Sequence, residues 1–175
     1  MNNNSALVTV LAVVILICSL GFIIFQSRPY SYRPRIVDIY FFDLGTGTIF
    51  LGKSNQIAPI DAPSGAGPEG VQLGVRAYVF SCGSCDNEAD RFIGWLERYT
   101  PEAKQQLLNP PKIDEASPAG PEMIDTWEKG HEIARYRKDL KTLKWVVNNS
   151  DAGYKIMQDV QNKCPNGQAN PCFPQ

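Results

Sequence analysis

Residues 75–85 of this 175-residue chain read VRAYVFSCGSC. Valine, tyrosine and phenylalanine favour β-structure, so residues 75–81 predict a strand that ends directly at a CxxC motif, Cys82 to Cys85. Apolar side chains then recur at i, i+1, i+4 and i+7, at Phe92, Ile93, Leu96 and Tyr99. This spacing predicts a helix over residues 86–99. The expected unit is therefore strand, CxxC, helix.

A predicted β-hairpin precedes this unit. Residues 36–42 (IVDIYFF) and 48–51 are rich in β-branched and aromatic side chains, with a turn at residues 43–47 between them. Residues 53–74 contain many Pro, Gly and Ala residues without a period, which predicts an irregular surface loop.

Helices and strands mix after residue 99. Thr100 followed by Pro101 is typical of a helix start, with Thr as the N-cap. The expected elements are a helix at 101–108, a Pro-rich loop at 109–121, a helical turn at 122–129, strands at 132–137 and 143–147, and a helix from Ser150 or Asp151 to about 163. Because these elements do not alternate strictly, the sequence favours an α+β domain with a mostly antiparallel sheet and two main helices.

Residues 6–25 form an uncharged, apolar stretch. Twenty helical residues at about 1.5 Å each span about 30 Å, the thickness of the hydrocarbon core of a bilayer. The preceding residues 1–5 lack the Lys or Arg of a signal peptide. We therefore expect a single-pass anchor in the lipid bilayer, a linker at 26–35, and one domain at 36–175.

The side of the membrane that the domain faces stays open. Arg28, Arg33 and Arg35 follow the apolar stretch, and the positive-inside rule then places the domain in the cytoplasm. Cysteine pairs in a small domain are instead typical of an oxidising compartment.

Four of the five cysteines lie in the expected domain, at Cys82, Cys85, Cys164 and Cys172. They could ligate a structural zinc ion as four thiolates, because CxxC supplies half of a tetrahedral site. They could also form two disulfides in any of three connectivities. The zinc ion or the disulfides would hold the C-terminal segment on the domain, whereas free thiols would have no special role.

A third alternative is redox catalysis at the CxxC. A helix N-terminus lowers the pKa of a thiol, so Cys82 could attack a disulfide and Cys85 could resolve the intermediate. This local pattern resembles a thioredoxin-like active site, although no X-Pro precedes a strand after Cys85. His131, the single histidine, could pair with a cysteine nucleophile, but a structural role is the ordinary one.

Charge separates the remaining classes of partner. The net charge of −1 gives no global attraction to nucleic acid. One cluster of basic residues stands out, at Arg135, Arg137, Lys138, Lys141 and Lys144. It could contact lipid phosphates or an acidic partner, whereas a solvated face is the ordinary outcome.

Three segments carry a resemblance, namely IYFFDLGTGTIF at 39–50, APIDAPSG at 58–65 and GVRAYVFSCGSC at 74–85. Through them the chain resembles uncharacterised small single-pass membrane proteins of planctomycete-type bacteria. The resemblance implies a membrane-anchored bacterial protein with four cysteines in recurring places, and it implies no catalytic role for any residue.

These observations predict a membrane-anchored, non-enzymatic interaction or accessory domain with a protein partner and two cysteine pairs. The alternative is a membrane-tethered thiol–disulfide oxidoreductase that uses Cys82 and Cys85.

Overall fold

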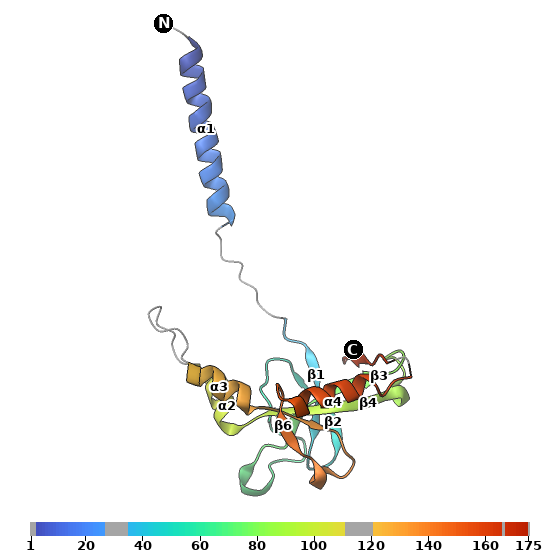
Figure 1. Cartoon of the computed structure of the whole chain (residues 1–175). Helices are drawn as coiled ribbons and strands as arrows, with labels where there is room; N and C mark the ends of the chain where they lie inside the picture. The colour runs from blue at the N-terminus through green and yellow to red at the C-terminus, as the bar shows by residue number, and fades with distance from the viewer. Residues whose placement is uncertain (1–2, 27–34, 111–120, 166, 175) are drawn as a thin grey trace. The chain divides into compact units, whose positions relative to one another are not determined.

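The chain forms two separate units, residues 1–35 and 36–175. The computed structural model describes residues 3–26, 35–110, 121–165 and 167–174 (Figure 1). The first unit holds helix α1 (Asn3–Gln26). Among the described residues, no helix combines the length and the apolar character needed to cross a membrane. The anchor at residues 6–25 therefore stays a prediction.

The second unit is an α+β domain built on a seven-stranded sheet. The strand order is β2-β1-β3-β4-β5-β6, β7 pairs with β3, and every pairing is antiparallel. The strands are β1 (Asp38–Asp43), β2 (Thr48–Lys53), β3 (Gly74–Ser81), β4 (Arg91–Tyr99), β5 (His131–Arg135), β6 (Trp145–Val147) and β7 (Asn170–Cys172). The helices are α2 (Pro101–Leu108), α3 (Pro121–Gly130) and α4 (Asp151–Gln161), with the short 3-10 helices η1 (Pro68–Gly70), η2 (Glu88–Asp90) and η3 (Leu140–Thr142).

The predicted α+β class and antiparallel sheet are confirmed, but the helix predicted over residues 86–99 is wrong. This segment is η2 followed by β4. The register between β3 and β4 shifts beside Tyr78, which leaves Gly94 as an extra residue of β4. The extra residue puts Phe92 and Trp95 into one cluster and Ile93 and Leu96 into another. A bulged strand thus places apolar side chains three residues apart, a spacing that is also typical of a helix.

One face of the sheet is concave and holds the main core. In a flat sheet, β1 and β5 would lie about 14 Å apart, because neighbouring strands are about 4.8 Å apart. The ring of Phe42 on β1 nevertheless packs edge-on against Tyr136, directly after β5, with 5.5 Å between centroids. The sheet therefore curls around a cluster that includes Val75, Val79 and Leu96.

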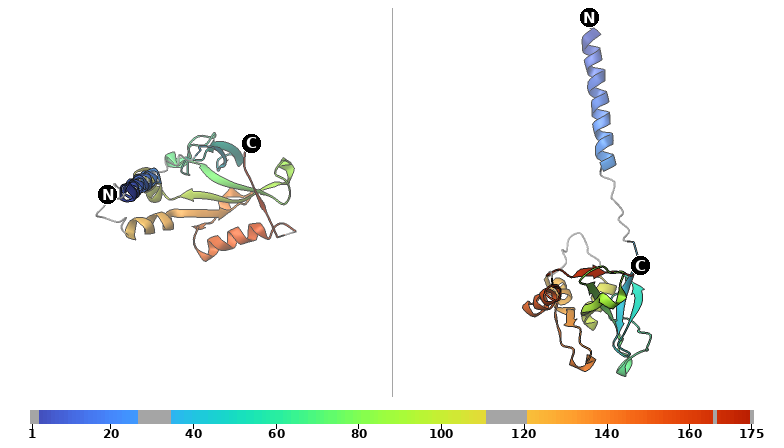
Figure 2. Two further views of the ribbon diagram at one scale, coloured as in Figure 1. Left: turned by 90° about the horizontal axis from the view of Figure 1, so that it is seen from above. Right: turned by 90° about the vertical axis from the view of Figure 1, so that its right-hand side faces the viewer.

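Two segments cover the other, convex face. Helix α4 contacts β4, β5 and β6 (Figure 2). It places Val160 against Phe80. The loop between β2 and β3 lies over β1, where Ala58 packs with the buried Phe41. That loop is irregular, as predicted, but it contributes to the core. Most of the second predicted loop, residues 111–120, lies outside the described residues.

Local signals placed two helix starts correctly. The hydroxyl of Thr100 accepts a hydrogen bond from the backbone N–H of Ala103 at the start of α2. The hydroxyl of Ser150 accepts from the N–H of Gly153 at 3.2 Å and caps α4. These caps satisfy backbone donors that have no partner within the helix.

Candidate functional site

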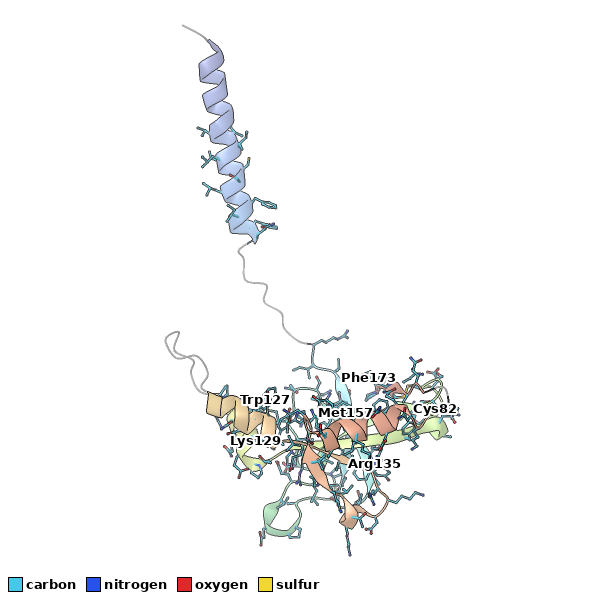
Figure 3. All side chains as sticks on the ribbon, in the orientation of Figure 1. Cys82, Trp127, Lys129, Arg135, Met157 and Phe173 are labelled. Carbon is cyan, nitrogen blue, oxygen red and sulfur yellow. A yellow bond between two sulfur atoms is a disulfide. The ribbon has the colours of Figure 1, made fainter. Side chains whose placement is uncertain are left out.

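The four cysteines of the domain form two disulfides, Cys82–Cys164 and Cys85–Cys172. The paired Cα atoms lie 5.2 and 5.5 Å apart, within the ordinary range for this bond. Of the three connectivities that the sequence left open, this one ties each member of the CxxC to the C-terminal segment. Figure 3 shows Cys82 at the opposite end of the domain from Trp127 on α3.

The CxxC lies in a turn and not at a helix N-terminus. The hydroxyl of Ser81 donates to the carbonyl of Ser84 at 3.0 Å and accepts from the N–H of Gly83 at 3.1 Å. The redox hypothesis required a helix after Cys85 to stabilise a thiolate, and two cysteines able to pair with each other. Here η2 and β4 follow, and each cysteine is bonded elsewhere. The structure thus gives the oxidoreductase no support.

The zinc hypothesis for Cys82, Cys85, Cys164 and Cys172 required four thiolates around one ion. The sulfur atoms are instead bonded in pairs. Across the described ranges, no group of three or more His, Cys, Asp or Glu side chains could hold a metal ion. The disulfide alternative is the one that the structure shows.

The two disulfides fasten the C-terminal segment to both faces of the sheet. Cys164 is buried with Phe80 on the convex face, whereas Cys172 belongs to the concave core. Strand β7, which ends at Cys172, pairs with residues 79–81 of β3. Its first residue, Asn170, donates through Nδ2 to the carbonyl of Gly83 at 3.1 Å. The tail is therefore an integral edge of the domain.

Arg91 holds the turn that carries the CxxC. Its Nε donates to the carbonyl of Cys85 at 2.7 Å, and its Nη1 donates to the hydroxyl of Tyr40 at 3.3 Å. Glu88 lies 3.5 Å from the same Nη1, but its side chain is 86% exposed, so this pair adds little. Through these two hydrogen bonds, Arg91 connects the start of β4 to the CxxC turn and to β1 across the concave face.

A cluster of titratable groups lies on β3, β4 and β5, around the buried Glu97. Tyr78 donates to Oε2 of Glu97 at 2.8 Å, and Nε2 of His131 lies 3.1 Å from the same oxygen. Arg76 reaches the other carboxylate oxygen at 3.6 Å. Burial raises the pKa of Glu97, but His131, Tyr78 and Arg76 together outweigh burial and lower it. Glu97 is therefore an ionised, buried carboxylate.

Neighbouring side chains hold His131 in place. The ring of Tyr99 stacks on His131 with 4.7 Å between centroids, and the side-chain amide of Asn148 lies 3.2 Å from Nδ1. Burial and the charge of Glu97 raise the pKa of the Tyr78 hydroxyl, so Tyr78 stays protonated and serves as a donor. A Cys–His nucleophile pair would need a free thiol, and all four cysteines of the domain are in disulfides.

Sequence reasoning missed Arg91 and Glu97. Neither residue has a local signature, because Tyr40 and Tyr78, which they contact, lie on other strands. The basic cluster that the sequence singled out is exposed, and Arg135 forms an ion pair with Asp159 on α4.

Comparison with protein-family models, curated proteins and solved structures finds no match. The resemblance to small planctomycete membrane proteins therefore stays a prediction.

Proposed function

We propose that the chain is a membrane-tethered, non-enzymatic interaction domain that works outside the cytoplasm. The crossed disulfides carry this proposal, because such bonds persist in oxidising compartments and are rare in the cytosol. Their positions indicate a structural role, since they fasten a short C-terminal strand that could hold few contacts alone.

The tether rests on the sequence of residues 6–25, which lacks charge over a membrane's thickness. Arg28, Arg33 and Arg35 oppose the proposed orientation under the positive-inside rule. We give the disulfides more weight, because two such bonds reflect the compartment of the domain directly.

A binding role is favoured because the polar side chains around Glu97 and Arg91 are engaged in structural contacts. Glu97 is shared by Tyr78, His131 and Arg76, and Arg91 is engaged with Cys85 and Tyr40. These contacts fix the sheet and the turn, and the two disulfides occupy all four cysteines of the domain. A rigid, stapled sheet is a suitable frame for recognition.

Thiol trapping in cells tests the proposal. The full chain is expressed in a Gram-negative bacterium, quenched in acid, and alkylated with a maleimide-polyethylene glycol before or after reduction. We expect at most Cys18 to react before reduction and all five cysteines after it. Free domain thiols in the unreduced sample would overturn the proposal.

The tether has its own measurement. Washing the membranes in alkaline carbonate removes peripheral proteins, and the full chain should stay in the pellet. Recovery in the supernatant would contradict the membrane tether, but it would not contradict the proposal of a disulfide-bonded interaction domain.

A further inference from the structure

Strand β4 is longer than its neighbour β5. Strand β3 pairs with β4 from Arg91 to Glu97, whereas β5 pairs with β4 from Trp95 onward. After Arg135, the chain leaves the sheet, and Tyr136 packs into the concave core. On the side away from β3, residues 91–94 thus have no strand neighbour among the described residues. An unpaired edge presents backbone donors and acceptors that another strand can use.

A groove of about 520 Å³ lies along this edge. Phe92, Ile93 and Gly94 line it from β4. Asp159 and Val160 line it from α4, and Lys163 lines it from just after the end of that helix. Arg135, the last residue of β5, also lines the groove. A strand placed about 4.8 Å from β4 would continue the line of β5 into this groove.

The groove carries positive side chains. Nζ of Lys163 lies 3.9 Å from the ring centroid of Phe92, directly beside the unpaired edge. Arg135 is 48% exposed, and the exposed Arg137 and Lys138 follow it in the sequence. Asp159 is the one acid in the lining and is already paired with Arg135.

We propose that this groove binds an extended acidic peptide segment, which adds to β4 as a strand. Main-chain hydrogen bonds to residues 91–94 would supply affinity, and Lys163 and Arg135 would select acidic side chains. The same charges disfavour a second copy of this chain, because the net positive charge of one groove would repel that of the other. This inference rests on the proposed function and names its class of partner.

The probe is the peptide acetyl-EVEVEVE-amide, labelled with fluorescein and added to the full chain in lipid nanodiscs. We expect saturable anisotropy and slower hydrogen–deuterium exchange in residues 91–94. Two matched peptides test the two parts of the proposal. The lysine twin, acetyl-KVKVKVK-amide, should bind at least about tenfold more weakly because its charge is wrong. A twin N-methylated along one edge should also lose about tenfold or more, because its main-chain bonds are blocked.

Three variants test the groove itself. Lys163→Glu should weaken binding of the acidic peptide about tenfold, because attraction becomes repulsion. Lys155→Glu is the matched control: Lys155 is exposed on α4 and does not line the groove, so affinity should be unchanged. Asp159→Asn should tighten binding about threefold, because it frees the guanidinium of Arg135. A gain in affinity is an outcome that damage to the fold does not produce.

Equal binding of the lysine twin or of the N-methylated twin would overturn the inference, as would wild-type affinity in Lys163→Glu. Hydrogen exchange of residues 91–94 is also measured without peptide at several protein concentrations. If exchange slows as the protein concentration rises, the edge pairs with a second copy of the chain and the inference is wrong. If the peptide fails to bind while thiol trapping finds both disulfides, the inference falls and the proposed function stands.

Discussion

Single side chains hold the loops of this domain, and Asp43 is the clearest case. It is fully buried at the end of β1, and its carboxylate accepts hydrogen bonds from the N–H groups of Gly45 and Ser64 at 2.8 and 2.9 Å. The hydroxyl of Ser64 donates to it at 2.7 Å. Burial raises the pKa of Asp43, but these bonds outweigh burial and lower the pKa to about 2. The ionised carboxylate thereby joins the hairpin turn to the loop before β3.

This shift predicts a pH dependence of stability. The pKa of Asp43 is lower in the folded chain than its ordinary value of 3.8, so its contribution is complete above about pH 4 and is lost as the pH falls towards 2. The full contribution is about 2 kcal/mol. In urea unfolding, Asp43→Asn should therefore be less stable than wild type at pH 6, and the gap should narrow at pH 2.5. A gap that does not change with pH would contradict this role.

Glu97 gives a second prediction at the same scale. Glu97→Gln removes the negative charge that His131 and Arg76 share, and it should lower the free energy of unfolding by about 1–3 kcal/mol. Tyr78→Phe removes one hydrogen bond to the same carboxylate and should cost about 1 kcal/mol. Urea unfolding at pH 7 ranks the two variants. A Glu97→Gln variant as stable as wild type would mean that the charge contributes nothing, because the amide oxygen of Gln can still accept the hydrogen bond from Tyr78.

Among the elements, α4 has an unusual requirement for glycine. Alanine normally stabilises a helix by about 1 kcal/mol relative to glycine. A Cβ at Gly153, however, would lie 2.7 Å from the carbonyl oxygen of Val147 and would also collide with that of Asn148. Backbone atoms cannot turn aside, so Gly153→Ala should destabilise the domain by about 1–3 kcal/mol in thermal unfolding. Gly83→Ala is the control: a Cβ there meets nothing within 4 Å, and stability should stay unchanged.

The elements also show where sequence reasoning succeeds. The hairpin, α2 and α4 were predicted because short-range signals define them, such as Thr100 before Pro101 and Ser150 before α4. The helix prediction for β4 is wrong because Gly94 shifts the alternation of apolar and polar side chains by one residue. Such a bulge forms against the partner strand, so the local sequence does not reveal it. Strand β7 has three residues, one of them Pro171, so no periodic pattern could announce it.

For the whole molecule, the connectivity of the cysteines lies beyond what a sequence encodes locally. The spacing of the cysteines in residues 82–85 and 164–172 indicates that the C-terminal segment is cross-linked to the domain. The sheet, however, decides which of the three disulfide connectivities forms. Strand β7 packs antiparallel to β3, which brings Cys172 beside the turn at Cys85 and leaves Cys164 beside Cys82. The site could be located from sequence, whereas its chemistry required the fold.

This arrangement predicts that the two disulfides are not independent. Either bond alone closes a long loop, with sequence separations of 82 and 87 residues, and constrains the unfolded chain by about 4–5 kcal/mol in the loop-entropy model. Once one bond exists, the second closes a ring of only about 13 residues, namely 82–85 and 164–172, and adds about 3 kcal/mol. Removing either bond with paired Cys→Ser substitutions should therefore cost about 3 kcal/mol, and removing both should cost more than twice as much.

Urea unfolding of the wild-type chain, Cys82→Ser with Cys164→Ser, Cys85→Ser with Cys172→Ser, and the fourfold variant completes the cycle. The two paired variants should have similar stability, because either remaining bond still fixes the tail to the turn. If the losses of stability in the two paired variants add up to the loss in the fourfold variant, the two disulfides constrain separate parts of the unfolded chain. The prediction that they act together would then be wrong. If the fourfold variant does not fold, the comparison of the two paired variants still tests their predicted equality.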